Sequence, residues 1–125
     1  MTRPVPSGHT ICEIVLHLTA WTREVTRRLH TGVAQDPEEG DWPAGGAATD
    51  AEWAAIVAAL DAANAGLLEA IGGLDEAQLY QRIGDVRDRA LGSGVSRYIT
   101  LHGVIQHDAY HAGQISLLKR AAQAS

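Results

Sequence analysis

Hydrophobic side chains recur every three or four residues over three long stretches of the chain, which is the pattern of amphipathic α-helices. The first stretch starts after Thr10, and Glu13 completes the capping-box pattern of a helix N-terminus. Gly32 follows this stretch, and glycine is the residue type most often found just beyond a helix C-terminus. The pattern therefore predicts a helix over Ile11–Thr31.

A loop and a second long helix follow. Residues 33–48 contain two prolines and three glycines among acidic residues, which is typical of a loop. Thr49 and Glu52 then repeat the capping-box pattern, which predicts the start of a helix. Its apolar positions continue to Gly72 and Gly73, where the helix is expected to end.

The rest of the chain predicts a connection and a third long helix. A short helical turn is expected over residues 75–79. Residues 80–95 carry charges and glycines but no sustained period, so they predict a surface connection. The helical period resumes over residues 96–122. We therefore predict an all-α helix bundle that forms a single domain over residues 1–125.

The charge balance limits the partners that this domain is expected to bind. Ten Lys and Arg residues against fifteen Asp and Glu residues give a net charge of −5. A nucleic-acid or anionic-membrane partner requires a basic face, so neither class is expected. No apolar run approaches the roughly 18 residues of a membrane span. Cys12 is the only cysteine, which excludes an intramolecular disulfide and fits a reducing cytoplasm.

Three of the six histidines form a candidate metal site. His107 and His111 are four residues apart, so they lie about 40° apart around a helix and can bind one metal ion. His17 lies at the margin of the apolar stripe of the first helix, from where it can reach a neighbouring helix. Metal sites in bundles are built from facing helices, and three histidines with an open coordination position are typical of catalytic sites. The alternative is that these histidines are ordinary interface residues that hydrogen-bond to carbonyl groups.

Other polar residues of the third helix are candidates for supporting roles. Gln114 lies about 20° from His107 around the helix and is expected either to orient a ligand imidazole or to bond a neighbouring helix. Tyr110 either donates its phenol to a substrate or packs at the edge of the core. Asp108 holds the general-base position of the metalloprotease H-E-x-x-H pattern, although a solvated carboxylate is the simpler interpretation. His102 lies too far around the helix to share the ion.

Two segments resemble the DinB/YfiT-like family of metalloenzymes: His17-Leu-Thr-Ala-Trp21 and His107-Asp-Ala-Tyr-His111-Ala-Gly-Gln114-Ile. The resemblance covers nearly the whole chain. It implies a four-helix bundle, often a homodimer, that binds one divalent ion, usually zinc or nickel. It also places the three metal ligands at His17, His107 and His111.

The resemblance implies an activity as well. Characterised members of the family are S-transferases or isomerases that use low-molecular-weight thiols such as bacillithiol or mycothiol. We therefore expect a cytoplasmic enzyme that activates such a thiol at its metal ion and acts on a small-molecule substrate. Two alternatives stay open, a metal-dependent hydrolase that uses metal-bound hydroxide and a metal-binding protein without catalytic activity.

The sequence departs from the family at its N-terminus. Members of the family normally have a further helix before the segment at which this sequence begins. We expect either that the start lies downstream of the family's usual start or that another copy completes the bundle. A bundle that lacks one helix exposes an apolar groove, and such surfaces normally bind a partner.

Overall fold

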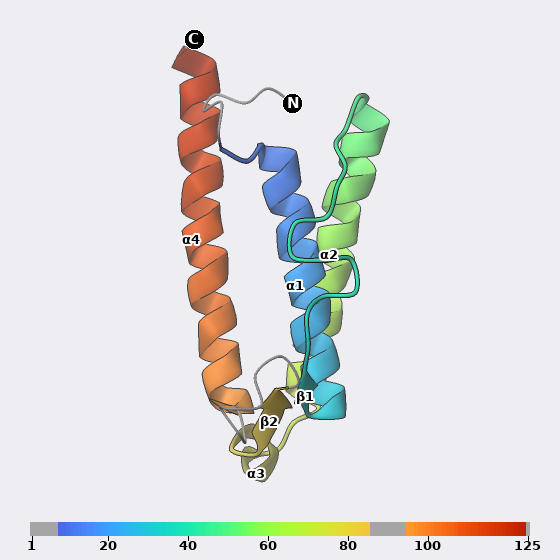
Figure 1. Ribbon diagram of the computed structural model, residues 1–125, viewed down its shortest axis with the longest axis vertical. Helices are drawn as coiled ribbons and strands as arrows, with labels where there is room; N and C mark the ends of the chain where they lie inside the picture. The colour runs from blue at the N-terminus through green and yellow to red at the C-terminus, as the bar shows by residue number, and fades with distance from the viewer. Residues whose placement is uncertain (1–7, 86–94, 125) are drawn as a thin grey trace.

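The computed structural model describes residues 8–85 and 95–124 (Figure 1). Three long helices pack together: α1 (Ile11–Thr31), α2 (Asp50–Gly72) and α4 (Arg97–Ala124). A short helix, α3 (Glu76–Leu79), lies at one end of the bundle, between the end of α2 and the start of α4. The predicted helical bundle and its three long helices are confirmed.

The ends of the first two long helices are set by local caps. The Thr10 hydroxyl accepts a hydrogen bond from the Glu13 backbone N–H at 3.1 Å, and the Glu13 carboxylate accepts one from the Thr10 N–H at 3.1 Å. Thr49 and Glu52 form the same reciprocal pair at the start of α2. Gly32 ends α1 with a φ of 73°, a left-handed conformation that glycine adopts at little cost. These contacts satisfy backbone groups that helix ends otherwise leave unpaired.

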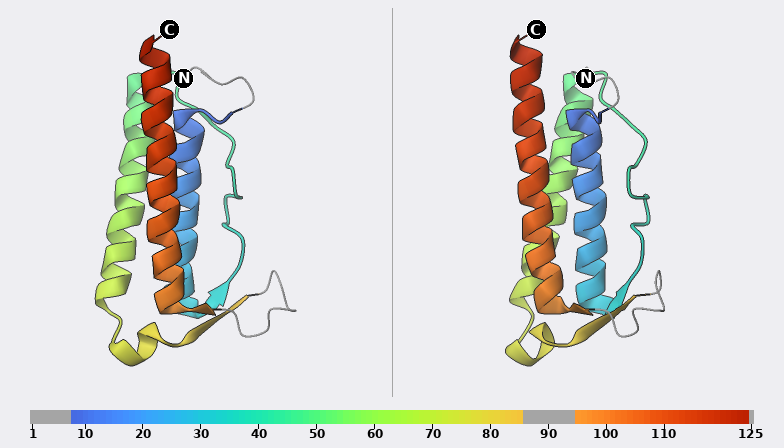
Figure 2. Two further views of the ribbon diagram at one scale, coloured as in Figure 1. Left: turned by 90° about the vertical axis from the view of Figure 1, so that its left-hand side faces the viewer. Right: turned by 60° about the vertical axis from the view of Figure 1, so that its left-hand side comes forward.

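The connection from α1 to α2 runs back along the length of the bundle (Figures 1 and 2). As a result α1 and α2 run in the same direction, and α4 runs in the opposite direction. The connection also lies against α1, where Asp41 and Trp42 contact side chains of that helix. This path brings a loop segment to the middle of the bundle, next to α1 and α4.

A small sheet joins the end of α1 to the start of α4. Its strands are β1 (Val33–Ala34), β2 (Arg82–Asp85) and β3 (Val95–Ser96), in the order β1-β2-β3. β1 is parallel to β2, and β2 is antiparallel to β3. The apolar pattern did not predict these strands, because two to four residues are too few to show a period of two. The rest of the predicted connection, residues 86–94, lies outside the described residues.

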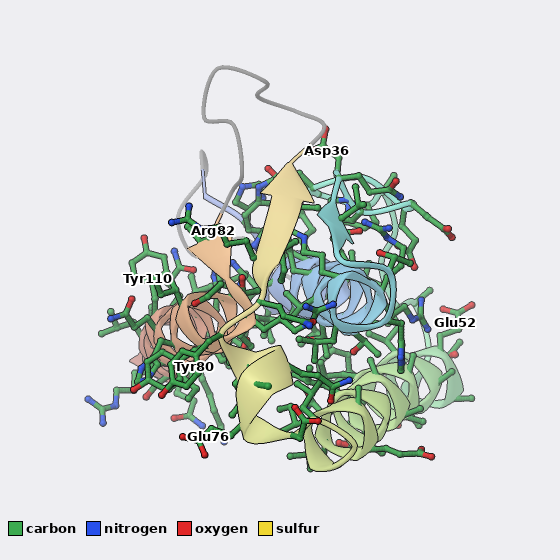
Figure 3. The ribbon with its side chains drawn as sticks, turned by 90° about the horizontal axis from the view of Figure 1, so that it is seen from below. Asp36, Glu52, Glu76, Tyr80, Arg82 and Tyr110 are labelled. Atoms are coloured by element: carbon green, nitrogen blue, oxygen red, sulfur yellow. The ribbon has the colours of Figure 1, made fainter. Side chains whose placement is uncertain are left out.

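The core lies where α1 meets its two neighbours. Seen from below, the three long helices are arranged around it in a triangle (Figure 3). Apolar side chains of α1 and α2 form a buried cluster against which side chains of α4 pack: Val25, Leu29, Leu67, Ala70, Leu101 and Val104. This packing holds α1 and α4 side by side and so fixes the two helices that carry the three candidate histidines.

Most of α2 faces away from this core. Only Ala63, Leu67 and Ala70 are buried among its 23 residues, and Leu68 is 70% exposed. By length and composition alone α2 could cross a membrane, which the absence of an unbroken apolar run did not indicate. Alanines account for nine of its residues, and a few charges interrupt them, so no long unbroken apolar run marks the helix. One helix of this kind is weak evidence for a membrane span, and α2 packs against α1 here.

Candidate metal centre

The structure brings the side chains of His17, His107 and His111 together. The Nε2 atom of His17 on α1 lies 3.0 Å from that of His107 and 3.1 Å from that of His111, both on α4. The two α4 nitrogens are 3.0 Å apart. We call these three side chains the histidine cluster. They form a group of ring nitrogens that could hold a metal ion.

The members of the histidine cluster differ in burial. His17 and His111 are each 4% exposed, whereas the side chain of His107 is 35% exposed. Burial lowers the pKa of His17, and it lowers the pKa of His107 to about 4 with help from the two neighbouring imidazoles. Both imidazoles are therefore neutral near neutral pH, which is the form that binds a metal ion.

Hydrogen bonds fix the orientation of two of the three rings. The Nδ1–H of His17 donates to the backbone carbonyl of Asp41 at 2.5 Å. The Nδ1 of His111 lies 2.6 Å from the side-chain oxygen of Gln114, whose amide nitrogen donates to the Tyr110 hydroxyl at 3.4 Å. Because both oxygens are acceptors, the Nδ1 atoms of both rings carry a proton, and the neutral His17 ring therefore has its lone pair on Nε2.

The arrangement of ring nitrogens in the histidine cluster fits a bound cation. The lone pair on His17 Nε2 then faces the Nε2 atoms of His107 and His111, which lie 3.0 Å and 3.1 Å away. Converging lone pairs repel unless a positive centre lies between them. Nitrogens about 2.0–2.1 Å from a tetrahedral zinc ion lie about 3.3–3.4 Å apart, so the cluster would open by only about 0.3 Å. The donor set therefore fits one divalent ion in size and in charge.

A loop segment that sequence reasoning did not connect to the site supports His17. The Asp41 carboxylate accepts a hydrogen bond from Trp21 Nε1–H at 2.7 Å, which holds the same residue whose carbonyl orients His17. Trp42 stacks on the His17 ring at 3.9 Å between centroids, and His9 stacks on Trp42 at 3.6 Å. Trp42 therefore covers one face of His17. Asp41 lies 24 residues from His17, and loop contacts of this kind leave no periodic signal.

The other sequence candidates lie near the cluster but in different surroundings. Asp108 is half-buried, burial raises its pKa, and its Oδ1 is 3.9 Å from His107 Nδ1. Tyr110 is 65% exposed and projects outward from α4, with its ring edge against His111 (Figure 3). His102 is exposed and packs against Tyr98, away from the cluster.

A cavity of about 390 Å³ opens between α1 and α4 beside the histidine cluster. His17 and His107 line it, and so do Trp21 and Asp108. We call it the α1–α4 cavity. It gives a small molecule access to the cluster from the side of His107, the least buried of the three histidines.

The chain matches a model of a known family. The model described as the DinB superfamily matches residues 1–115 of the chain. None of the curated proteins and none of the solved structures compared with the chain matches it.

Proposed function

Because the chain belongs to the DinB superfamily, we propose that its histidine cluster binds one divalent ion and that the protein is a thiol-dependent S-transferase or isomerase. The observation that carries the proposal is the convergence of three imidazole nitrogens at 3.0–3.1 Å. Imidazole ligands suit zinc and nickel alike, so either ion fits the proposal.

The chemistry that such an ion supplies is acidification of a thiol. A divalent ion lowers the pKa of a bound thiol from its ordinary value near 8.5, so the thiolate is present at neutral pH. The protein's own thiol is poorly suited to this role, because burial raises the pKa of Cys12 and its side chain lies outside the histidine cluster. The nucleophile in this proposal is therefore a separate low-molecular-weight thiol.

The chain's own residues organise the site. The Asp41 carbonyl and the Gln114 amide hold two of the imidazoles in place, and Trp42 shields one face of His17 from water. The α1–α4 cavity leaves the side of His107 accessible to a substrate. In the reaction the thiolate sulfur attacks an electrophilic carbon and a C–S bond forms. The bond from that carbon to its leaving group breaks, and the leaving group departs with the electron pair.

A test measures displacement of chloride from 1-chloro-2,4-dinitrobenzene by bacillithiol, mycothiol or cysteine, with zinc or nickel present. We expect protein-dependent product only when both a thiol and the metal are present. His111→Ala should lower the rate to that without protein, because it removes a buried member of the cluster. His102→Ala is the matched control, since this exposed histidine is on the same helix and outside the cluster. Equal rates for both variants would contradict the proposal.

Hydrolysis is the second candidate, and the position of Asp108 favours it. This carboxylate lines the α1–α4 cavity next to His107, and its raised pKa brings it closer to the range of a general base that activates water. Hydrolysis of a small ester that needs no thiol and is abolished by Asp108→Asn would favour a hydrolase over an S-transferase. Metal binding with neither activity would favour a non-catalytic metal-binding protein.

The remaining expectations from the sequence stay predictions. The homodimer is supported by the large apolar side chains exposed on α2 and α4, including Leu68, Ile105 and Leu117. The cytoplasmic location rests on the single cysteine. The absence of nucleic-acid and membrane partners rests on the net charge of −5.

A further inference from the structure

The α1–α4 cavity is walled mainly by apolar side chains. Trp21 and Val25 of α1 face Ile99 and Val104 of α4 across it, and Val95 of β3 lies at the same cavity. Val95 and Ile99 are 49% and 56% exposed, so large apolar side chains gather at its rim. Its volume of about 390 Å³ is at the small end of the roughly 300–1,000 Å³ of ligand pockets. A compound of one or two aromatic rings suits such a space.

Among the described residues, the arginine that lines the cavity is already paired. Arg28 lines the cavity, but its Nε donates to the buried Glu24 carboxylate and its Nη2 donates to the Gln35 carbonyl at 3.0 Å. Its guanidinium also lies 5.5 Å from the centre of the Trp21 ring. Because the Glu24 carboxylate and the Gln35 carbonyl already bind two of its donor groups, Arg28 attracts an anionic ligand less than a free arginine would.

The other charged groups that line the cavity in the described part of the chain are acidic. Asp41 and Asp108 line it, and the side chain of Asp41 is 62% exposed. Without a bound metal ion their charge repels anions from the cavity. The cavity therefore favours an uncharged ligand over an anionic one of the same shape.

Gly103 leaves room in the wall formed by α4. It lines the cavity in the middle of a helix, where glycine costs about 1 kcal/mol relative to alanine. A Cβ built at Gly103 has no heavy atom within 4 Å. A side chain added at this position therefore starts in open space at the wall of the cavity, with no protein atom against its Cβ.

We propose that the α1–α4 cavity binds the uncharged, aromatic part of the substrate and that Gly103 sets the largest size it admits. That the bound compound is a substrate rests on the proposed function, whereas its binding in the α1–α4 cavity requires neither a thiol nor turnover. His111 does not line the cavity, so binding in the cavity and metal-dependent activity can be lost separately.

The test compares two naphthalene derivatives of similar shape, 2-naphthol, which is uncharged at neutral pH, and 2-naphthoate, which is an anion. Binding of each to the full chain is measured by isothermal titration calorimetry, without metal and again with zinc. The variants are Gly103→Leu and its control Gly113→Leu, which is on the same helix, also has no heavy atom within 4 Å of a built Cβ and does not line the cavity. Both substitutions replace glycine with a better helix former, so neither should impair folding, and circular dichroism checks this.

We expect 2-naphthol to bind the metal-free wild type at least about tenfold more tightly than 2-naphthoate. Gly103→Leu should weaken 2-naphthol binding at least about tenfold, and Gly113→Leu should change it less than about twofold. His111→Ala should retain 2-naphthol binding even where it abolishes metal-dependent activity, which separates this proposal from the proposed function. No binding of 2-naphthol to the wild type, preference for the anion, or equal affinity in the two glycine variants would each overturn the proposal.

Discussion

The parallel helices α1 and α2 are similar in length but differ in where their side chains lie. In α1, twelve of 21 residues are buried, including the polar residues Glu24 and Arg28. In α2, which is far more apolar, three of 23 residues are buried. The helix with more charge is therefore the one inside. Burial here follows the number of neighbours, because α1 packs against α2, α4 and the connection that follows it, whereas α2 packs chiefly against α1.

The buried polar groups of α1 are tolerated because each has a partner. The Glu24 carboxylate accepts hydrogen bonds from Arg27, from Arg28 and from the backbone N–H of Gln35. Burial alone would raise the pKa of Glu24, but these donors outweigh it and lower the pKa. Among the residues that the structure describes, no buried side-chain nitrogen or oxygen lacks a hydrogen-bond partner. This network also ties the loop after α1 to the helix that carries His17.

The largest stability difference between the two helices should come from their carboxylates. Glu24→Ala leaves the buried Arg28 without its anionic partner, which should lower the free energy of unfolding by about 3–5 kcal/mol. Glu69→Ala removes an exposed carboxylate from α2 and should change it by less than about 0.5 kcal/mol. Urea denaturation of both variants checks this. A similar loss for both would mean that α1 is not the buried helix of the pair.

Two neighbouring leucines of α2 differ in burial and should differ in their contribution to stability. Leu67 is 7% exposed and packs in the core cluster, so Leu67→Ala should cost about 2–4 kcal/mol. Leu68 is 70% exposed, so Leu68→Ala should cost less than about 0.5 kcal/mol. Thermal and urea denaturation measure both. If Leu68→Ala destabilises as much as Leu67→Ala, the exposed face of α2 is covered in solution, which would favour the predicted homodimer.

The histidine cluster adds a smaller, pH-dependent difference. In the unfolded chain histidine has a pKa near 6.5, whereas burial in the folded protein lowers the pKa of His107 to about 4. Between these values the unfolded chain binds more protons, so the metal-free protein should lose stability as the pH falls from about 6.5 to about 4. His107→Gln should lose less over this range, and His102→Gln should behave as the wild type. Urea denaturation in the presence of a chelator measures this, and identical pH profiles for all three proteins would contradict it.

Much of the fold could be predicted from local sequence signals. Thr10 and Thr49 mark the starts of α1 and α2, and Gly32 marks the end of α1, because capping depends on only a few neighbouring residues. The sheet and the exposure of α2 could not be predicted, since both depend on which distant segments meet. The path of the loop from α1 to α2 is a further feature of this kind.

The same distinction holds for the candidate site, where features of a single helix could be predicted and contacts with a distant loop could not. The spacing of His107 and His111 is a property of one helix, so their common face could be predicted, and His17 was a candidate from its place at the margin of the apolar stripe. The support from Asp41 and Trp42 could not, because it depends on a loop that returns along the bundle. Gln114 was a candidate from its position on α4, and its contact with His111 is part of the site.

The proposal that the histidine cluster binds a divalent ion is tested most directly by elemental analysis. The protein is purified without an affinity tag, incubated with zinc or nickel and freed of unbound metal. We predict about one equivalent in the wild type and in His102→Ala, and almost none in His107→Ala. No bound metal in the wild type, or equal amounts in His107→Ala and the wild type, would contradict the claim.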